Sequence, residues 1–111
     1  MVARTVIEGA RHYLRLVDAS GIPVSFGVLF GSVARGETTE ESDIDLLVVS
    51  PRLDGKRSYT DVAGLWRLTA RSDSRVEPIP VGERVWQEDD SRAVIETARR
   101  EGKIIKLEKS T

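Results

Sequence analysis

Apolar residues recur at helical spacing near the N-terminus and at strand spacing further along the chain. Between residues 3 and 19 they fall on one side of a helix, while charged residues occupy the other side. Gly21 and Pro23 predict the end of this helix. The apolar stripe consists of Val6, Ile7, Ala10, Tyr13, Leu14 and Val17.

Two apolar runs in the middle of the chain predict strands. Residues 24–30 form a short β-rich run that stops at a Gly-Ser pair. Residues 43–49 give the strongest strand pattern, and a Ser-Pro pair ends it. The second half of this run is continuously apolar, so we expect its strand to be covered on both faces. The polar segment between the runs, residues 31–42, is predicted to form a turn or the start of a helix.

Helices and strands alternate again in the C-terminal half. The proline residues Pro78 and Pro80 indicate an edge or short strand. We interpret Trp66 as a core residue of its helix, and Trp86 as a packing residue in a loop. The predicted order is a basic loop over 52–57, a helix with capping-box spacing at Ser58 and Asp61, a strand over 75–81, a loop over 82–89, a helix that closes at Gly102, and a strand over 103–107.

This order predicts an α/β fold, in the form of an α+β two-layer domain that spans residues 1–111. A chain of 111 residues can bury one modest core. It has no cysteine, which excludes disulfides, thiolate metal sites and a cysteine nucleophile. The net charge of −1 gives no general basic field for nucleic acid, and no apolar run reaches membrane length. We therefore expect a cytoplasmic protein.

A pair of aspartates opens the strongest strand. Residues i and i+2 of a strand point to the same face, so Asp43 and Asp45 should project together while Ile44 points into packing. Two adjacent carboxylates repel each other unless a cation lies between them. Mg²⁺ prefers such oxygen ligands and binds through one or two carboxylates together with substrate phosphates. The pair therefore predicts a Mg²⁺ site.

The Gly-Ser pair that precedes these aspartates suits a phosphate group. Gly31 allows the backbone to approach a phosphate closely, and Ser32 adds a hydroxyl donor. A later strand carries a further carboxylate, Glu77, which can complete a second metal site or accept a proton. Together these residue types indicate phosphoryl-transfer chemistry.

Two segments carry a family resemblance: Leu29 to Glu37 and Ser42 to Val48. They resemble the minimal nucleotidyltransferases, whose fold is similar to the catalytic core of DNA polymerase β. The resemblance implies Asp43 and Asp45 as metal ligands, and Gly31 and Ser32 as phosphate binders. Arg35 also matches a position that recurs in this subgroup. We assign it to the nucleotide site, with an ion pair to Glu37 or Asp45 as the alternative.

The resemblance also implies the reaction and the partner. Members of the family transfer a nucleoside monophosphate, with ATP the favoured donor, and many stand-alone members are antitoxins beside a small helical partner of the HEPN class. It implies Glu77 as the third carboxylate, although Glu41, Asp73 and Glu83 compete for that role. A non-catalytic antitoxin or regulatory subunit with a vestigial nucleotide site is the alternative function. A homo-oligomer is also left open.

Overall fold

The computed structural model describes residues 4–31, 34, 36, 43–54, 59–72, 75–88 and 93–107. Within them, helices and strands alternate much as the sequence predicts. The elements are α1 (Arg4–Ala19), β1 (Phe26–Phe30), β2 (Ile44–Ser50), the 3₁₀ helix η1 (Pro51–Leu53), α2 (Tyr59–Thr69), β3 (Val76–Gly82), α3 (Glu83–Glu88), α4 (Ala93–Glu101) and β4 (Lys103–Ile105). None of the described helices is both long enough and apolar enough to cross a bilayer.

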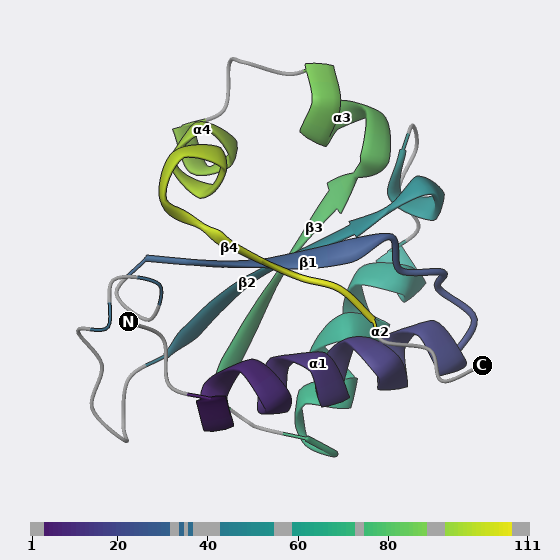
Figure 1. The fold of residues 1–111 in the computed structure, drawn as a ribbon. Coiled ribbons are helices and arrows are strands. Elements are labelled where there is room, and N and C mark those ends of the chain that lie inside the picture. The colour runs from purple at the N-terminus through teal and green to yellow at the C-terminus, as the bar shows by residue number, and fades with distance from the viewer. Residues whose placement is uncertain are drawn as a thin grey trace.

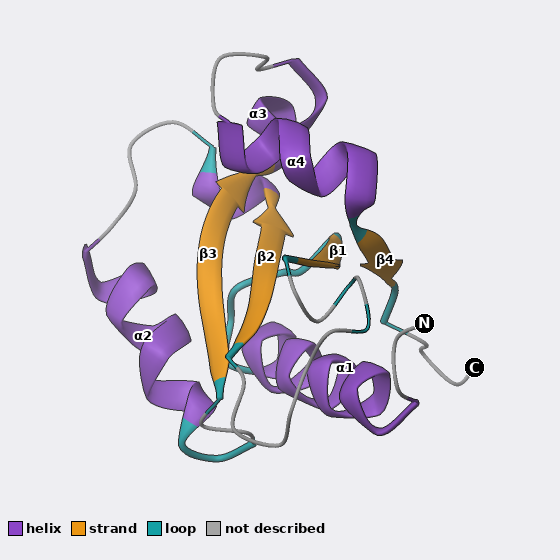
Figure 2. Ribbon diagram, turned by 90° about the vertical axis from the view of Figure 1, so that its left-hand side faces the viewer, coloured by secondary structure: helices purple, strands orange, loops and turns teal. Residues whose placement is uncertain are grey.

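The strands form one mixed sheet in the order β3-β2-β1-β4 (Figure 1). β1 is antiparallel to both of its neighbours, whereas β2 and β3 are parallel. Figure 2 shows β2 and β3 side by side, pointing toward α3 and α4. β3 lies at an edge of the sheet, as its two prolines predict, because proline cannot donate a ladder hydrogen bond.

Helices cover both faces of the sheet, which gives the predicted α+β fold. α1 and α2 pack on one face and α3 and α4 on the other (Figure 1). Alternate residues of β2 enter the two clusters: Leu46 and Val48 contact the α1 side, and Leu47 and Val49 contact the α4 side. The prediction that this strand is covered on both faces is confirmed.

The predicted N-terminal helix is confirmed as α1. Its apolar stripe buries Ala10, Tyr13, Leu14 and Val17 against the sheet. Beyond the helix, Gly21 has a φ of 111°, a conformation that side chains with a Cβ rarely adopt. The glycine therefore allows the chain to leave the helix and turn toward β1.

Tyr13 predicts a measurable loss of stability. Its side chain is fully buried, and its hydroxyl donates to the carbonyl oxygen of Leu65 on α2 at 2.6 Å. We expect Tyr13→Phe to cost about 1 kcal/mol in unfolding free energy, because the bond that joins α1 to α2 is lost. Chemical denaturation would measure it. Ser20→Ala changes an exposed residue whose hydroxyl donates to the carbonyl oxygen of Val17 in the same turn, and should cost less than about 0.5 kcal/mol. Equal losses in the two variants would contradict the prediction.

Trp66 does not lie in the core, so that prediction was wrong. The tryptophan is 48% exposed on α2, whereas Leu65 is fully buried and supplies the contact with the sheet. Both residues fall on an apolar stretch of a short helix, and helical periodicity alone does not orient such a stretch. Leu65 belongs to the buried cluster that α1 and the sheet share, so packing between elements decides which side chain faces inward.

Residues 83–88 form the helix α3 rather than the predicted loop. The carboxylate of Asp54 accepts a hydrogen bond from the backbone N–H of Arg84 at 3.0 Å and so caps the first turn. This cap lies 30 positions away in the sequence, so no local pattern could reveal it. Trp86 has the predicted packing role: its ring meets Phe26 edge-on at 5.6 Å, and the guanidinium of Arg99 lies 5.5 Å from its centroid.

Candidate functional site

Three carboxylates gather where β2 and β3 begin. Asp43 immediately precedes β2, and Asp45 is the second residue of that strand. In the parallel ladder Asp45 is the register partner of Glu77, and in the antiparallel ladder it is the partner of Phe30. Strand pairing therefore joins acidic residues that are more than 30 positions apart in the sequence.

These acidic side chains lie on the face of the sheet that α3 and α4 cover further along the strands. Asp45 shares its side of β2 with Leu47 and Val49, both of which belong to the cluster beneath α4. Glu77 shares its side of β3 with Ile79 and Val81 of the same cluster. Asp43 is exposed, and Asp45 and Glu77 are half-buried, so solvent and ligands can reach the group.

The carboxylates interact directly with one another. Partial burial, followed by the charges of Asp43 and Asp45 and hydrogen bonds with them, raises the pKa of Glu77. Each of these effects disfavours the ionised form of Glu77. The structure therefore brings together the three acidic residues that the sequence singled out.

None of the other three candidates for a third carboxylate is found beside the aspartates among the described residues. Glu83 accepts a hydrogen bond from Ser25 and follows β3 at its far end. The strand between it and Glu77 spans roughly 20 Å, so Glu83 cannot join the aspartates. Glu41 and Asp73 lie outside the described residues.

Gly31 follows β1 and lies against the carboxylate of Asp45. Its φ is 72°, which favours glycine. A Cβ atom added at this position would lie 2.5 Å from Oδ2 of Asp45. The predicted phosphate loop thus begins beside the predicted metal ligand. The other two predicted nucleotide-binding residues, Ser32 and Arg35, lie outside the described residues.

The chemistry of the three carboxylates suits a divalent cation. Carboxylate oxygens are the ligands that Mg²⁺ prefers, and their mutual repulsion is relieved when a cation binds. In the described part of the chain, no group of three or more His, Cys, Asp or Glu side chains is arranged to hold a metal ion. Mg²⁺ can bind through only one or two carboxylates, with waters and substrate phosphates completing its shell. The pair of Asp43 and Asp45 therefore fits a cation whose remaining ligands are water or phosphate.

The raised pKa of Glu77 predicts how stability depends on pH without metal. Below its ordinary pKa of 4.5, Glu77 is protonated in both folded and unfolded chains. As pH rises above that value the unfolded chain releases its proton first, so the folded state loses stability until Glu77 ionises there too. We expect Glu77→Gln to raise the melting temperature at pH 7 and to change it less at pH 4.

Thermal unfolding in EDTA at the two pH values measures this difference. Glu88→Gln is the matched control, because it removes one negative charge from an exposed position on α3. If the melting temperature at pH 7 rises equally in both variants, net charge rather than the carboxylate cluster is responsible for the rise.

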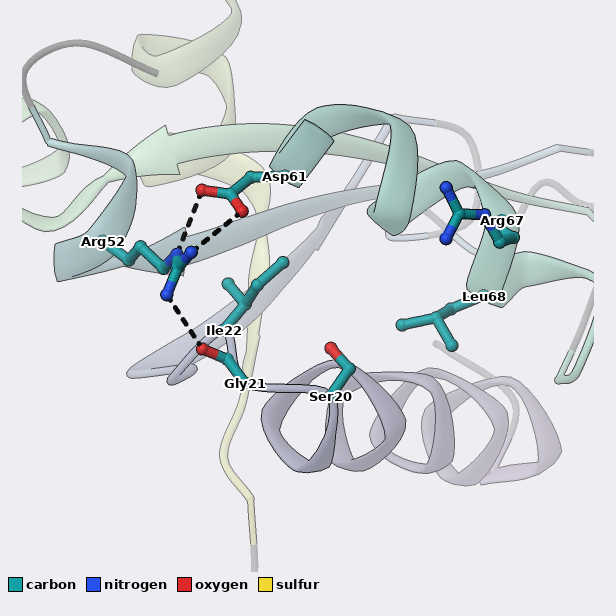
Figure 3. Close-up of a pocket in the computed structure, with 7 residues that line it drawn as sticks. All are labelled: Ser20, Gly21, Ile22, Arg52, Asp61, Arg67 and Leu68. Atoms are coloured by element: carbon teal, nitrogen blue, oxygen red, sulfur yellow. Dashed lines mark hydrogen bonds and ion pairs between the residues drawn. The ribbon is translucent and has the colours of Figure 1, made fainter. Parts of the chain in front are cut away.

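A cavity of about 250 Å³ lies on the opposite face of the sheet, between the end of α1, η1 and α2 (Figure 3). Arg52 makes two hydrogen bonds to the carboxylate of Asp61, at 3.0 and 3.3 Å, and one to the carbonyl oxygen of Gly21 at 3.4 Å. The charge of Arg52 is therefore matched within the protein. The sequence predicts only a basic loop over 52–57 here, and no local pattern indicates the contact of Arg52 with Gly21, which lies 31 positions away.

Known proteins share both the sequence pattern and the fold. The family model described as "nucleotidyltransferase domain" matches residues 20–110. No curated protein sequence matches the chain significantly. Among solved structures, a protein from Sulfolobus solfataricus that is described as a nucleotidyltransferase is 21% identical, with a TM-score of 0.60 over 90% of this chain and 78% of that one.

Two further structures are toxin–antitoxin complexes. One, described as a toxin–antitoxin with AMP-PNP, is 20% identical with a TM-score of 0.59, over 86% of this chain and 71% of that one. The other is a tri-AMPylated HEPN toxin from Shewanella oneidensis in complex with its MNT antitoxin. The matching chain of that complex is 18% identical to this one, with a TM-score of 0.54 over 89% of this chain and 71% of that chain. At these identities the likeness establishes the fold.

Proposed function

Because the chain belongs to the nucleotidyltransferase domain family, we propose that it transfers a nucleoside monophosphate from a nucleoside triphosphate to an acceptor hydroxyl. The observation that carries the proposal is the register of β2 and β3, which places Glu77 beside Asp45 where the two strands begin. Three acidic residues so close together are costly unless they bind a cation, and the family's reaction uses one.

Each residue then has a role in an in-line displacement. Asp43 and Asp45 would hold Mg²⁺, and the ion would supply charge neutralisation at the triphosphate. Gly31, Ser32 and Arg35 bind the β- and γ-phosphates. The acceptor oxygen bonds to the α-phosphorus, and the bond between that phosphorus and the bridging oxygen breaks to release pyrophosphate. Glu77 accepts the hydroxyl proton or completes a second metal site.

We further propose that ATP is the donor and that a partner protein supplies the acceptor. Two structures of similar fold are toxin–antitoxin complexes, one with AMP-PNP and one with an AMPylated HEPN toxin. By this likeness the chain is the antitoxin of a HEPN-like helical partner in the cytoplasm, and it attaches AMP to a tyrosine or serine of that partner.

Transfer of label from ATP labelled at the α-phosphate tests the proposal. The protein is incubated with Mg²⁺ and with the helical protein that co-purifies with it or is encoded beside it. Label should appear on the partner, and EDTA should abolish it. Parallel reactions with the other three nucleoside triphosphates establish the donor. No label from any of the four, despite a stable complex, would overturn catalysis and favour a non-catalytic antitoxin.

A further inference from the structure

We propose that Gly31 is a positioning residue for the Asp45 carboxylate, in addition to any contact it makes with phosphate. The inference rests on the proposed function, because it assigns Asp45 to the metal. The positioning role follows because glycine has no Cβ, whereas the phosphate role depends on the backbone of the same residue.

The geometry that supports this lies at the junction of β1 and β2. Phe30, the last residue of β1, is the register partner of Asp45, so the next residue passes directly beside the Asp45 side chain. A Cβ on Gly31 would lie 2.5 Å from Oδ2 and 3.5 Å from Cγ of Asp45. Ordinary contacts begin at 3.4 Å, so the carboxylate occupies the space that any side chain at residue 31 would need.

The same strand pairing places Glu77 on the other side of Asp45. Glu77 is the register partner of Asp45 on β3, while Gly31 follows β1, which lies on the opposite side of β2. The Asp45 carboxylate therefore has neighbours on both flanks. An added methyl group at residue 31 would have to displace Oδ2 by about 0.5 Å or more, because it would lie 2.5 Å away and a Cβ is essentially never found closer than 3.0 Å to another heavy atom. A displacement of that size changes the geometry of a metal site.

Stability alone would not reveal this role. The atom that must move is the end of a side chain, which can rotate at little energetic cost. Gly31→Ala also suffers strain from its positive φ of 72°. Gly21→Ala is the matched control, since its φ is 111° and no atom lies within 4 Å of an added Cβ. Both variants carry backbone strain, but only Gly31→Ala moves the carboxylate.

Binding of Mn²⁺ to the full chain without nucleotide separates the two roles, with electron paramagnetic resonance reporting free Mn²⁺. We expect Gly31→Ala to weaken Mn²⁺ binding at least about tenfold, in the direction of Asp45→Ala, while Gly21→Ala binds like the wild type. A crystal structure of Gly31→Ala should show the Asp45 carboxylate rotated or shifted away from residue 31.

Wild-type Mn²⁺ affinity in Gly31→Ala, with loss of affinity in Asp45→Ala, would overturn the positioning role and leave the proposed function intact. An unmoved carboxylate in the crystal structure would overturn it as well. If the wild type itself binds no Mn²⁺ without nucleotide, the crystal structure alone decides the role of Gly31. If it binds none in the presence of AMP-PNP either, the metal assignment within the proposed function fails.

Discussion

Replacing Asp43 and Asp45 together by alanine should lower the rate of nucleotidyl transfer by roughly 10³-fold or more, since loss of the metal removes about 4 kcal/mol of transition-state stabilisation. The fold should survive. Asp43 is exposed and Asp45 half-buried, so their truncation opens no cavity in the core. Burial is the main reason that the pKa of Glu77 is raised, and the charges of Asp43 and Asp45 add to it; the double variant removes that second contribution. Transfer from α-labelled ATP measures the rate, and thermal unfolding in EDTA should give an equal or higher melting temperature.

The control is a double variant that also removes two negative charges, but at positions away from the acidic site. Glu88→Ala with Glu96→Ala removes two carboxylates from exposed positions on α3 and α4, and the pair that Glu96 makes with Arg100, at 3.6 Å, is a weak surface contact. This control should transfer label like the wild type. Transfer by the aspartate variant at the wild-type rate would contradict the metal assignment. If that variant loses transfer but still neutralises its partner, contact rather than catalysis is responsible for neutralisation.

Gly102→Ala should destabilise the protein by about 3 kcal/mol. Gly102 joins α4 to β4, and its N–H donates to the carbonyl oxygen of Ala98 at 2.8 Å. An added Cβ would lie 2.5 Å from Cγ1 of Val28, 3.0 Å from the carbonyl oxygen of Leu29, and closer still to that of Ala98. Two of these atoms belong to backbone that is fixed by a helix and a sheet, so the crowding cannot be relieved by a side-chain rotation.

Chemical denaturation of Gly102→Ala beside Gly64→Ala measures the effect. No atom lies within 4 Å of a Cβ added to Gly64, which sits inside α2. The control should therefore stabilise the protein by about 0.5–1 kcal/mol, because alanine loses less backbone entropy than glycine in a helix. Wild-type stability of Gly102→Ala would contradict the close packing of α4 against β1 at this residue.

Local patterns determined much of the fold. The stripe of α1 and the apolar run of β2 are periodic over enough residues to select one type of element, and the run also indicated that both faces of β2 would be covered. The prolines of β3 placed it at an edge, because a missing N–H is a local property. The spacing of the two aspartates also predicts that they share one side of a strand, because residues i and i+2 point to the same face.

Tertiary structure decided what local patterns could not. The capping of α3 by Asp54 and the outward position of Trp66 depend on residues far away in the chain. The acidic group also depends on pairing between distant segments: the parallel pairing of β2 with β3 places Glu77 beside Asp45 and leaves Glu83 at the far end of β3. The contact between Gly31 and Asp45 also arises from strand pairing. Sequence periodicity specifies which side of an element is buried, but the register between elements specifies which side chains meet.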